Sequence, residues 1–344
     1  MSNRTTQSLL LAAGLVALLW ACGPKGAQLF DQDVDLSNAP VAPGVDREPL
    51  GGHLASACED RRRGELKGAK AHFIAHLRAN PRSATAHYEL GLLHMEAKRW
   101  DRARWRFERA FELDSNLFGA LSNLGVIGLQ TREQIAAVKA LEKAIALVPA
   151  DPRVLNNLAN AWLRRGRIND AIESYARARK TTPDHATMLY NEALAHLEMN
   201  DGERAVELLK LALAVRPGFA LGRALRVAAL HQTGRLKLAT QAAQQDLELI
   251  TPGPDNHLVL GRVLIAQGKV KEGMEALQRA VSLGPKHGPA VFALAEAQDA
   301  RRQLSQAVAL YKAYLKLPTR RFEESRQARR RLRILRQATK GEGA

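Results

Sequence analysis

The sequence predicts an all-α protein built from helical hairpins that repeat along the chain. Proline recurs every 34 residues, as Pro149, Pro183 and Pro217, and each proline closes a pair of amphipathic segments. Within each pair, apolar residues recur at three- and four-residue spacing, which indicates helices with one buried face. Aromatic residues make up only 5% of the chain, which is typical of an array of helices rich in alanine and leucine.

The most regular hairpin spans residues 152–183. Leu158 and Trp162 mark the buried face of its first helix. Gly166 predicts the end of that helix, because glycine adopts the left-handed conformation without steric cost. A second helix follows, with Ala171 where the two helices cross. A hairpin this short cannot bury its own apolar face, so it needs neighbours of the same kind.

Those neighbours repeat the pattern in phase. The crossing position holds a small residue in successive units: Ala103, Ala137, Ala171, Ala205, Ala239, Gly273 and Ala307. This period and pattern resemble the tetratricopeptide repeat. The resemblance covers about seven units over residues 84–319. It implies a right-handed superhelical solenoid whose first helices line a concave groove for partner peptides.

The fourth and fifth units depart from the family pattern. Glu192 stands where leucine is expected in the fourth unit. In the fifth, Arg223, Arg226 and Asp246 occupy positions that the family usually fills with apolar or small residues. We expect these helices to form but to pack less well than the others.

The first 21 residues are typical of a lipoprotein signal peptide. Arg4 gives a positive start, and the apolar run from Leu9 to Leu19 is too short to span a membrane. The motif Leu-Trp-Ala-Cys, which ends at Cys22, resembles the lipobox of bacterial lipoproteins. That resemblance implies cleavage before Cys22, lipidation of its thiol and a palmitate-type acyl chain on the new amine. The alternative is an ordinary secretory signal with an incidental cysteine.

The resemblance to lipoproteins also implies a place in the cell. Gly23, which follows the cysteine, is compatible with sorting to the bacterial outer membrane, with the protein facing the periplasm. Residues 22–50 are punctuated by Pro, Gly and Asp, so we expect a lipidated, flexible tether. If Cys22 is lipidated, Cys58 has no partner in the chain, and no disulfide framework forms.

Both ends of the array are predicted to be capped. Residues 51–83 read as a partial capping repeat, and residues 320–344 as a basic capping helix and tail. The formal net charge is +16, and its densest part is a basic patch in this last helix: Arg329, Arg330, Arg331 and Arg333. The patch is either a solvated capping face or a site for anionic lipid or lipopolysaccharide. Nucleic acid is not expected as a partner, because an exported lipoprotein does not meet it.

The candidate binding site is a column of amides on the first helices. The groove residues that we single out are Asn123, Asn156, Asn157, Asn160 and Asn191, with Tyr88 and Tyr190 nearby. An amide both donates and accepts hydrogen bonds, so such a column suits the backbone of an extended peptide. The alternative is that the family favours asparagine here for its own packing. The lysine and arginine clamp of chaperone-binding relatives is absent apart from Arg153.

A basic and aromatic cluster spans residues 98–109. Trp105 lies off the core stripe among arginines, so it is a candidate surface anchor. The alternative is that Trp105 packs against the second helix of the preceding unit.

Nothing in the sequence predicts catalysis. There is no Gly-rich phosphate loop, GxSxG or HExxH motif. His72 and His76 lie one helical turn apart, but no third ligand stands at a fixed spacing, so we expect no metal site and no cofactor.

We therefore expect a protein-binding scaffold or assembly factor of the bacterial envelope. Similar architecture occurs in pilotin lipoproteins of type IV pili and in lipoproteins of motility and secretion machines. The alternative is an envelope regulator that binds a peptidoglycan enzyme or an anionic envelope ligand.

Overall fold

The computed structural model describes residues 52–249, 253–318 and 322–341, and every regular element in these ranges is an α-helix. The predicted signal peptide (1–21), Cys22 and the tether (22–50) lie outside the described residues. The described helices fall into two compact units, one ending at Ala195 and the other beginning at His196. The all-α repeat fold expected from the periodicity is confirmed within these ranges.

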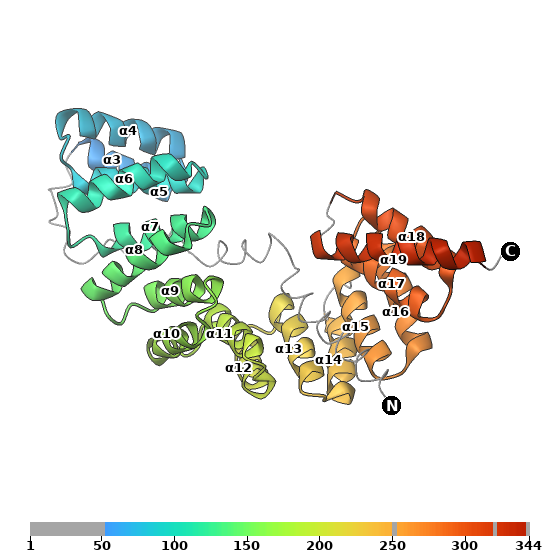
Figure 1. Ribbon diagram of the computed structural model, residues 1–344. Coiled ribbons are helices and arrows are strands. Elements are labelled where there is room, and N and C mark those ends of the chain that lie inside the picture. The colour runs from blue at the N-terminus through green and yellow to red at the C-terminus, as the bar shows by residue number, and fades with distance from the viewer. Residues whose placement is uncertain (1–51, 250–252, 319–321, 342–344) are drawn as a thin grey trace. The chain divides into compact units, whose positions relative to one another are not determined.

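The unit that ends at Ala195 consists of successive antiparallel hairpins (Figure 1). Its helices are α3 (His53–Arg62), α4 (Leu66–Ala79), α5 (Ala84–Glu96), α6 (Trp100–Leu113), α7 (Phe118–Gln130), α8 (Gln134–Leu147), α9 (Pro152–Arg164), α10 (Ile168–Thr181) and most of α11 (Ala186–Glu198).

The unit that begins at His196 continues the same order of helices. Its helices are α12 (Gly202–Val215), α13 (Ala220–Gln232), α14 (Leu236–Leu249), α15 (Pro254–Ala266), α16 (Val270–Leu283), α17 (Gly288–Ala300), α18 (Leu304–Lys316) and α19 (Phe322–Gly341). From α5 to α17, each first helix begins 34 residues after the one before it, as the proline spacing predicts.

The turn inside each hairpin uses one left-handed residue at a fixed place. These residues lie 34 apart and have φ between 53° and 87°: Gly64, Lys98, Arg132, Gly166, Asn200, Gly234, Gly268 and Arg302. Gly166 therefore ends α9 as the sequence predicts. Four of the eight are not glycine, so the packed hairpin imposes the turn even where the residue disfavours it.

The core lies where the two helices of a hairpin cross. The crossing alanines, from Ala103 to Ala307, are completely buried, as expected. In the sixth unit the two backbones touch, because a Cβ on Gly273 would lie only 2.8 Å from the carbonyl oxygen of Gly261. The small residues therefore set how closely the axes approach.

Three of the four polar residues that depart from the family pattern form ion pairs, whereas Arg226 Nε is buried without a hydrogen-bond partner among the described residues. Glu192 is only 2% exposed, and its carboxylate accepts a hydrogen bond from Arg179 Nε at 2.9 Å. Arg223 Nη1 donates to Asp246 Oδ1 at 2.7 Å within the fifth hairpin. Each of these two acids therefore has its partner on an adjacent helix, which the sequence pattern did not anticipate.

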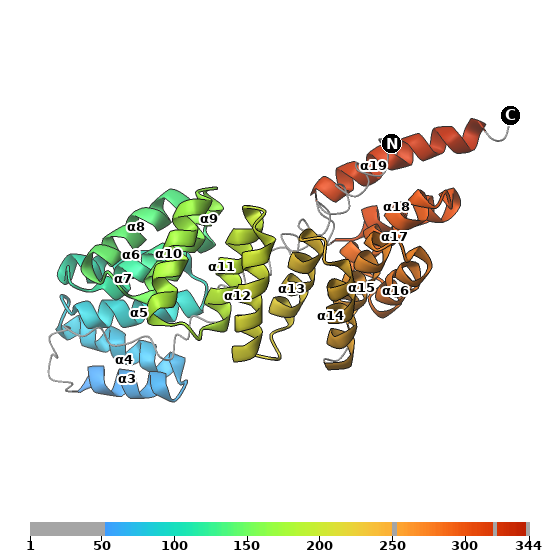
Figure 2. The same ribbon diagram turned by 90° about the horizontal axis from the view of Figure 1, so that it is seen from below.

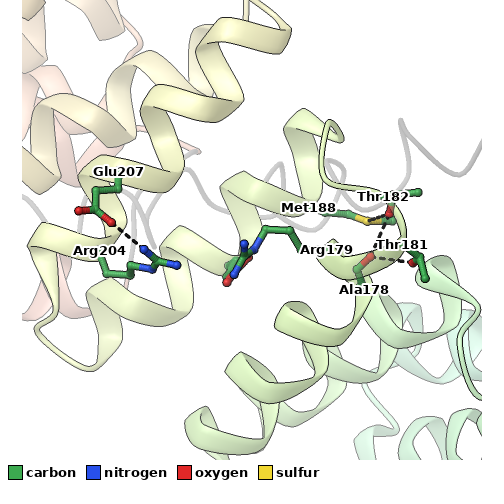
Figure 3. Close-up of polar contacts among 8 residues, drawn as sticks. Ala178, Arg179, Thr181, Thr182, Met188, Arg204 and Glu207 are labelled. Carbon is green, nitrogen blue, oxygen red and sulfur yellow. Dashed lines mark hydrogen bonds and ion pairs between the residues drawn. The ribbon is translucent and has the colours of Figure 1, made fainter.

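Figure 3 shows Arg179 near the end of α10. The hydroxyls of Thr181 and Thr182 both donate to the Ala178 carbonyl, at 2.9 and 3.1 Å, and so satisfy one of the last carbonyls of this helix. The Thr182 hydroxyl also lies 3.5 Å from the sulfur of Met188 on α11. The end of α10 and the start of α11 are thus joined beside the Arg179–Glu192 pair.

The last helix, α19, packs on α18 (Figure 2). Its inner face is buried at Ser325, Ala328, Leu332 and Leu335. Phe322 lies three residues before Ser325, where the helical spacing would continue this face, but it is 80% exposed. Phe322 is the first residue of α19, and the packed face begins one turn later.

Candidate functional site

First helices of neighbouring hairpins are linked by polar side chains. Asn123 on α7 donates through Nδ2 to the hydroxyl of Tyr88 on α5, at 3.3 Å. Asn191 on α11 donates through Nδ2 to Oδ1 of Asn156 on α9, at 3.2 Å. Both bonds join residues 35 apart, so Asn123 links α7 to α5 and Asn191 links α11 to α9.

Asn160 lies inside a hairpin. Its side chain is 1% exposed, and its Oδ1 accepts a hydrogen bond from the hydroxyl of the fully buried Tyr175 on α10. Its Nδ2 is buried and has no partner among the described residues. Asn160 therefore packs α9 against α10, and its amide has no exposed surface to offer a peptide.

The two tyrosines of the predicted groove are largely covered. Tyr88 is half-buried and packs on Phe107, with the ring centroids 5.5 Å apart. Burial raises the pKa of the Tyr88 hydroxyl, which therefore stays protonated at neutral pH. Tyr190 on α11 is buried. Both rings pack within the structure, and Tyr88 contacts the neighbouring hairpin through its bond with Asn123 and through its ring, which lies against Gly119 of α7.

Asn157 is the predicted groove residue that remains available. It is half-buried on α9, and within the described ranges its side chain has no hydrogen-bond partner. The neighbouring Asn156 uses only its oxygen for Asn191, which leaves the Asn156 NH2 group without a described partner. Arg153, one turn earlier, is exposed and pairs with Asp151 at 2.9 Å. These side chains form a polar patch on α9, which we call the Asn157 patch.

The basic patch on α19 is divided by its contacts. Arg331 donates to both carboxylate oxygens of the buried Asp299 on α17, at 2.7 and 2.6 Å. This bidentate pair fastens α19 to α17. Arg329, Arg330 and Arg333 are exposed and have no carboxylate partner among the described residues. Three of the four predicted patch residues are therefore available, while Arg331 is structural.

Sequence reasoning also missed an ion pair between α3 and α5. Arg61 on α3 donates to Glu89 on α5 at 2.5 Å, and Glu89 is buried. Burial raises the pKa of the Glu89 carboxyl, and the Arg61 charge opposes that shift. A carboxylate on the buried face of a first helix is a signal that could have prompted a search for a basic partner one hairpin earlier.

The described ranges contain neither a cluster of metal ligands nor a membrane-spanning helix. No group of three or more His, Cys, Asp or Glu side chains gathers there as metal ligands would. His72 Nε2 lies 3.7 Å from Asp60 Oδ2, and His72 Nδ1 lies 3.2 Å from His53 Nδ1. Among the described helices, none combines the length and apolar composition that a membrane crossing requires.

Family models match the chain along most of its described length. One model, described as the tetratricopeptide repeat, matches residues 54–116 and 136–186. A second model with the same description matches residues 255–332. Together they cover more than half of the chain, including α3 and α4 as well as the first part of α19.

Two curated relatives are similar over parts of the chain. The CTR9 homologue of Arabidopsis thaliana is 24% identical over 222 residues, which is 60% of this chain and 20% of that protein. The peroxisomal targeting signal receptor of Candida albicans is 35% identical over 91 residues, which is 26% of this chain and 15% of that protein. The chain thus spans a fifth or less of the length of these relatives.

Two solved structures share the fold. A tetratricopeptide repeat protein from Parabacteroides merdae superposes with a TM-score of 0.62 and 13% identity, over 73% of this chain and 98% of that one. The pilF protein of Pseudomonas aeruginosa superposes with a TM-score of 0.53 and 19% identity, over 63% of this chain and 97% of that one. At these identities the likeness concerns the fold.

Proposed function

Since the chain belongs to the tetratricopeptide repeat family, we propose that it is a non-enzymatic scaffold or assembly factor with a peptide-binding face on its first helices. Repeats of this family bind protein or peptide partners. Within one compact unit, each hairpin contributes one first helix to that face, so a partner can contact several hairpins at once.

One observation carries the proposed binding site: Asn157 is the one predicted groove residue whose whole amide is available within the described ranges. With the free NH2 of Asn156, it offers donors and an acceptor to an extended backbone. The bond between the buried Asn191 and the half-buried Asn156 links α11 to α9, so the Asn157 patch stands on a fixed support.

We further propose that the protein is anchored by lipid at Cys22 to the bacterial outer membrane and faces the periplasm. The apolar segment followed by Leu-Trp-Ala-Cys supports this location, and two or more acyl chains give a stable anchor where one chain does not. A lipobox followed by tandem repeats supports a role in a pilus, secretion or motility complex. The exposed Arg329, Arg330 and Arg333 add a surface that attracts anionic lipid or lipopolysaccharide.

Photocrosslinking tests the binding face. A benzoylphenylalanine at position 157 should capture a discrete partner in the native envelope, whereas the same probe at the exposed position 180 on α10 should not capture it. Asn157→Ala should then weaken binding of the captured partner, while the matched control Asn116→Ala, in an exposed turn, should leave it unchanged. Equal capture of the partner from positions 157 and 180 would contradict the proposed binding face.

Cell fractionation tests the anchor separately. Cys22→Ser should release the protein from the membrane fraction and abolish incorporation of labelled palmitate. The matched control Cys58→Ser should keep both properties, because Cys58 is half-buried inside the first unit. Membrane association that persists in Cys22→Ser would refute the lipid anchor and leave the binding face untouched.

A further inference from the structure

A cavity of about 450 Å³ opens between the second helices α4 and α6. It lies within the unit that ends at Ala195, over the first helix α5, which contributes Leu90 and His94. Its volume falls in the range of natural ligand pockets. It is built by second helices, so it is separate from the Asn157 patch on the first helices.

The cavity combines apolar walls with an exposed aromatic ring. Ile74 is half-buried and supplies aliphatic surface, Leu90 lines the cavity with only 1% of its surface exposed, and Trp105 lines one side with 55% of its surface exposed. The Trp105 ring meets His87 edge-on, at 5.7 Å between centroids. A large exposed indole beside aliphatic groups is uncommon on a solvent-exposed surface and common where a partner protein binds.

Arg106 is held in place at this wall. Its guanidinium lies 4.8 Å from the centroid of the Trp105 ring, and its Nη1 donates to Nδ1 of His87 at 3.1 Å. His87 in turn bonds through Nε2 to the Pro81 carbonyl at 3.3 Å. These contacts fix the guanidinium before any ligand arrives, which lowers the entropy that binding would cost.

The cavity carries uncompensated positive charge. Lys70, Arg102 and Arg106 line it, and within the described part of the chain none of them has a carboxylate partner. Asp101 is the acidic residue of the lining. By contrast, Arg104 on the same helix pairs with Glu133 at 2.7 Å. The positive charges of Lys70, Arg102 and Arg106 are therefore available to a ligand, whereas the charge of Arg104 is neutralised by Glu133 of the next hairpin.

His94 adds a buried polar group that faces the cavity. It is more than nine-tenths buried, lines the cavity, and has no side-chain hydrogen-bond partner among the residues described. Burial, with the charges of Lys70, Arg106 and Arg102, lowers its pKa to about 4, so the imidazole is neutral at physiological pH. A neutral imidazole can donate a hydrogen bond to a ligand in the cavity or accept one from it.

We propose that this cavity binds an acidic segment of a protein partner, with one apolar side chain against Ile74 and Trp105. The flanking carboxylates of that segment pair with Lys70, Arg102 and Arg106. The apolar wall favours a peptide over inorganic phosphate or a lipid headgroup, since neither of these has an apolar group to bury there. The protein would then contact partners on two faces, through the first helices and through this cavity.

Calorimetric titration of the full chain tests the proposal with defined probes. The probes are acetylated peptides that carry one leucine, phenylalanine or tryptophan between two pairs of glutamates. We expect at least one to bind, and its glutamine counterpart to bind at least about tenfold more weakly, because each lost charge-assisted contact approaches a factor of ten. Arg102→Glu should cause a similar loss, whereas the matched control Lys180→Glu, exposed on α10, should change affinity less than about twofold.

A second variant guards against a folding defect. Trp105 is mostly exposed, so Trp105→Ala should keep the circular dichroism spectrum and melting temperature of the parent protein. The same variant should still bind the acidic peptide more weakly than the parent does. The proposal is overturned if none of the acidic peptides binds, or if Arg102→Glu and Trp105→Ala bind the peptide as the parent does. It is also overturned if inorganic phosphate or anionic phosphatidylglycerol vesicles occupy the cavity in preference to the peptide.

Discussion

Replacing Arg179 with methionine tests how far the fourth unit depends on a buried ion pair. Glu192 on α11 is 2% exposed, and its carboxylate lies 2.9 Å from Arg179 Nε on α10. The Arg179 side chain is 32% exposed, so water reaches the Arg179 guanidinium more easily than the Glu192 carboxylate. Without Arg179, the carboxylate is buried with no opposite charge, or it must bind a proton.

The expected loss follows from this asymmetry. Removing one partner of a fully buried pair costs about 3–5 kcal/mol, and the partial exposure of Arg179 reduces this to about 2–4 kcal/mol. The control is Arg204→Met on α12. Arg204 lies 2.7 Å from Glu207, but both side chains are exposed, at 44% and 62% (Figure 3). An exposed pair of this kind contributes about 0.5 kcal/mol or less.

The assay is urea unfolding followed by far-ultraviolet circular dichroism, with hydrogen exchange of α10 and α11 as a local readout. Arg179→Met should lower the unfolding midpoint well beyond Arg204→Met and speed exchange in these two helices. The double variant Arg179→Met with Glu192→Leu should recover most of the loss, because an apolar pair fills the site without an unpaired charge. Equal midpoints for Arg179→Met and Arg204→Met would refute the reasoning.

Two further predictions concern the helix crossing and the pH response. Gly273→Ala should lower the free energy of unfolding by about 1–3 kcal/mol, because the new Cβ would lie 2.8 Å from the Gly261 carbonyl oxygen. The cost of this overpacking exceeds the gain in helix propensity. An unchanged melting temperature would contradict the prediction. The pKa of His94 is about 4, below its usual value of about 6.5, so the unfolded chain takes up the proton first as pH falls. Stability should therefore be lost between about pH 6.5 and 4, and His94→Gln should lose less over that range in thermal melts.

The repeat architecture could be predicted because the spacing of apolar and small residues in the sequence is periodic. Helix boundaries recur every 34 residues, and the crossing alanines are buried as their phase requires. The turn residues show the limit of such rules. Gly166 was recognised because it is glycine, whereas Lys98, Arg132 and Asn200 adopt the same left-handed conformation. Packing of the two helices fixes the turn, so residue type alone does not reveal it.

The candidate sites could be predicted only in part. The phase placed the asparagines on the first helices, but it did not show that Asn123 and Asn191 bond to side chains 35 residues away. The cluster at residues 98–109 drew attention to Trp105, but Lys70 and His94 come from helices α4 and α5 and were missed. Which polar groups remain unpaired depends on contacts between hairpins, and a pattern within one hairpin does not contain that information.

The sequence by itself determined the helices, their phase and the small residues at each crossing. It did so because these depend on interactions within about one repeat, where the spacing of apolar residues dictates which face is buried. Only the tertiary structure decided the roles of the polar residues: Glu192 and Asp246 as buried ion-pair partners, Arg331 as a structural contact, and Asn157 as an available amide. A polar side chain is structural or available according to what lies within hydrogen-bonding distance, and that is set when neighbouring hairpins pack.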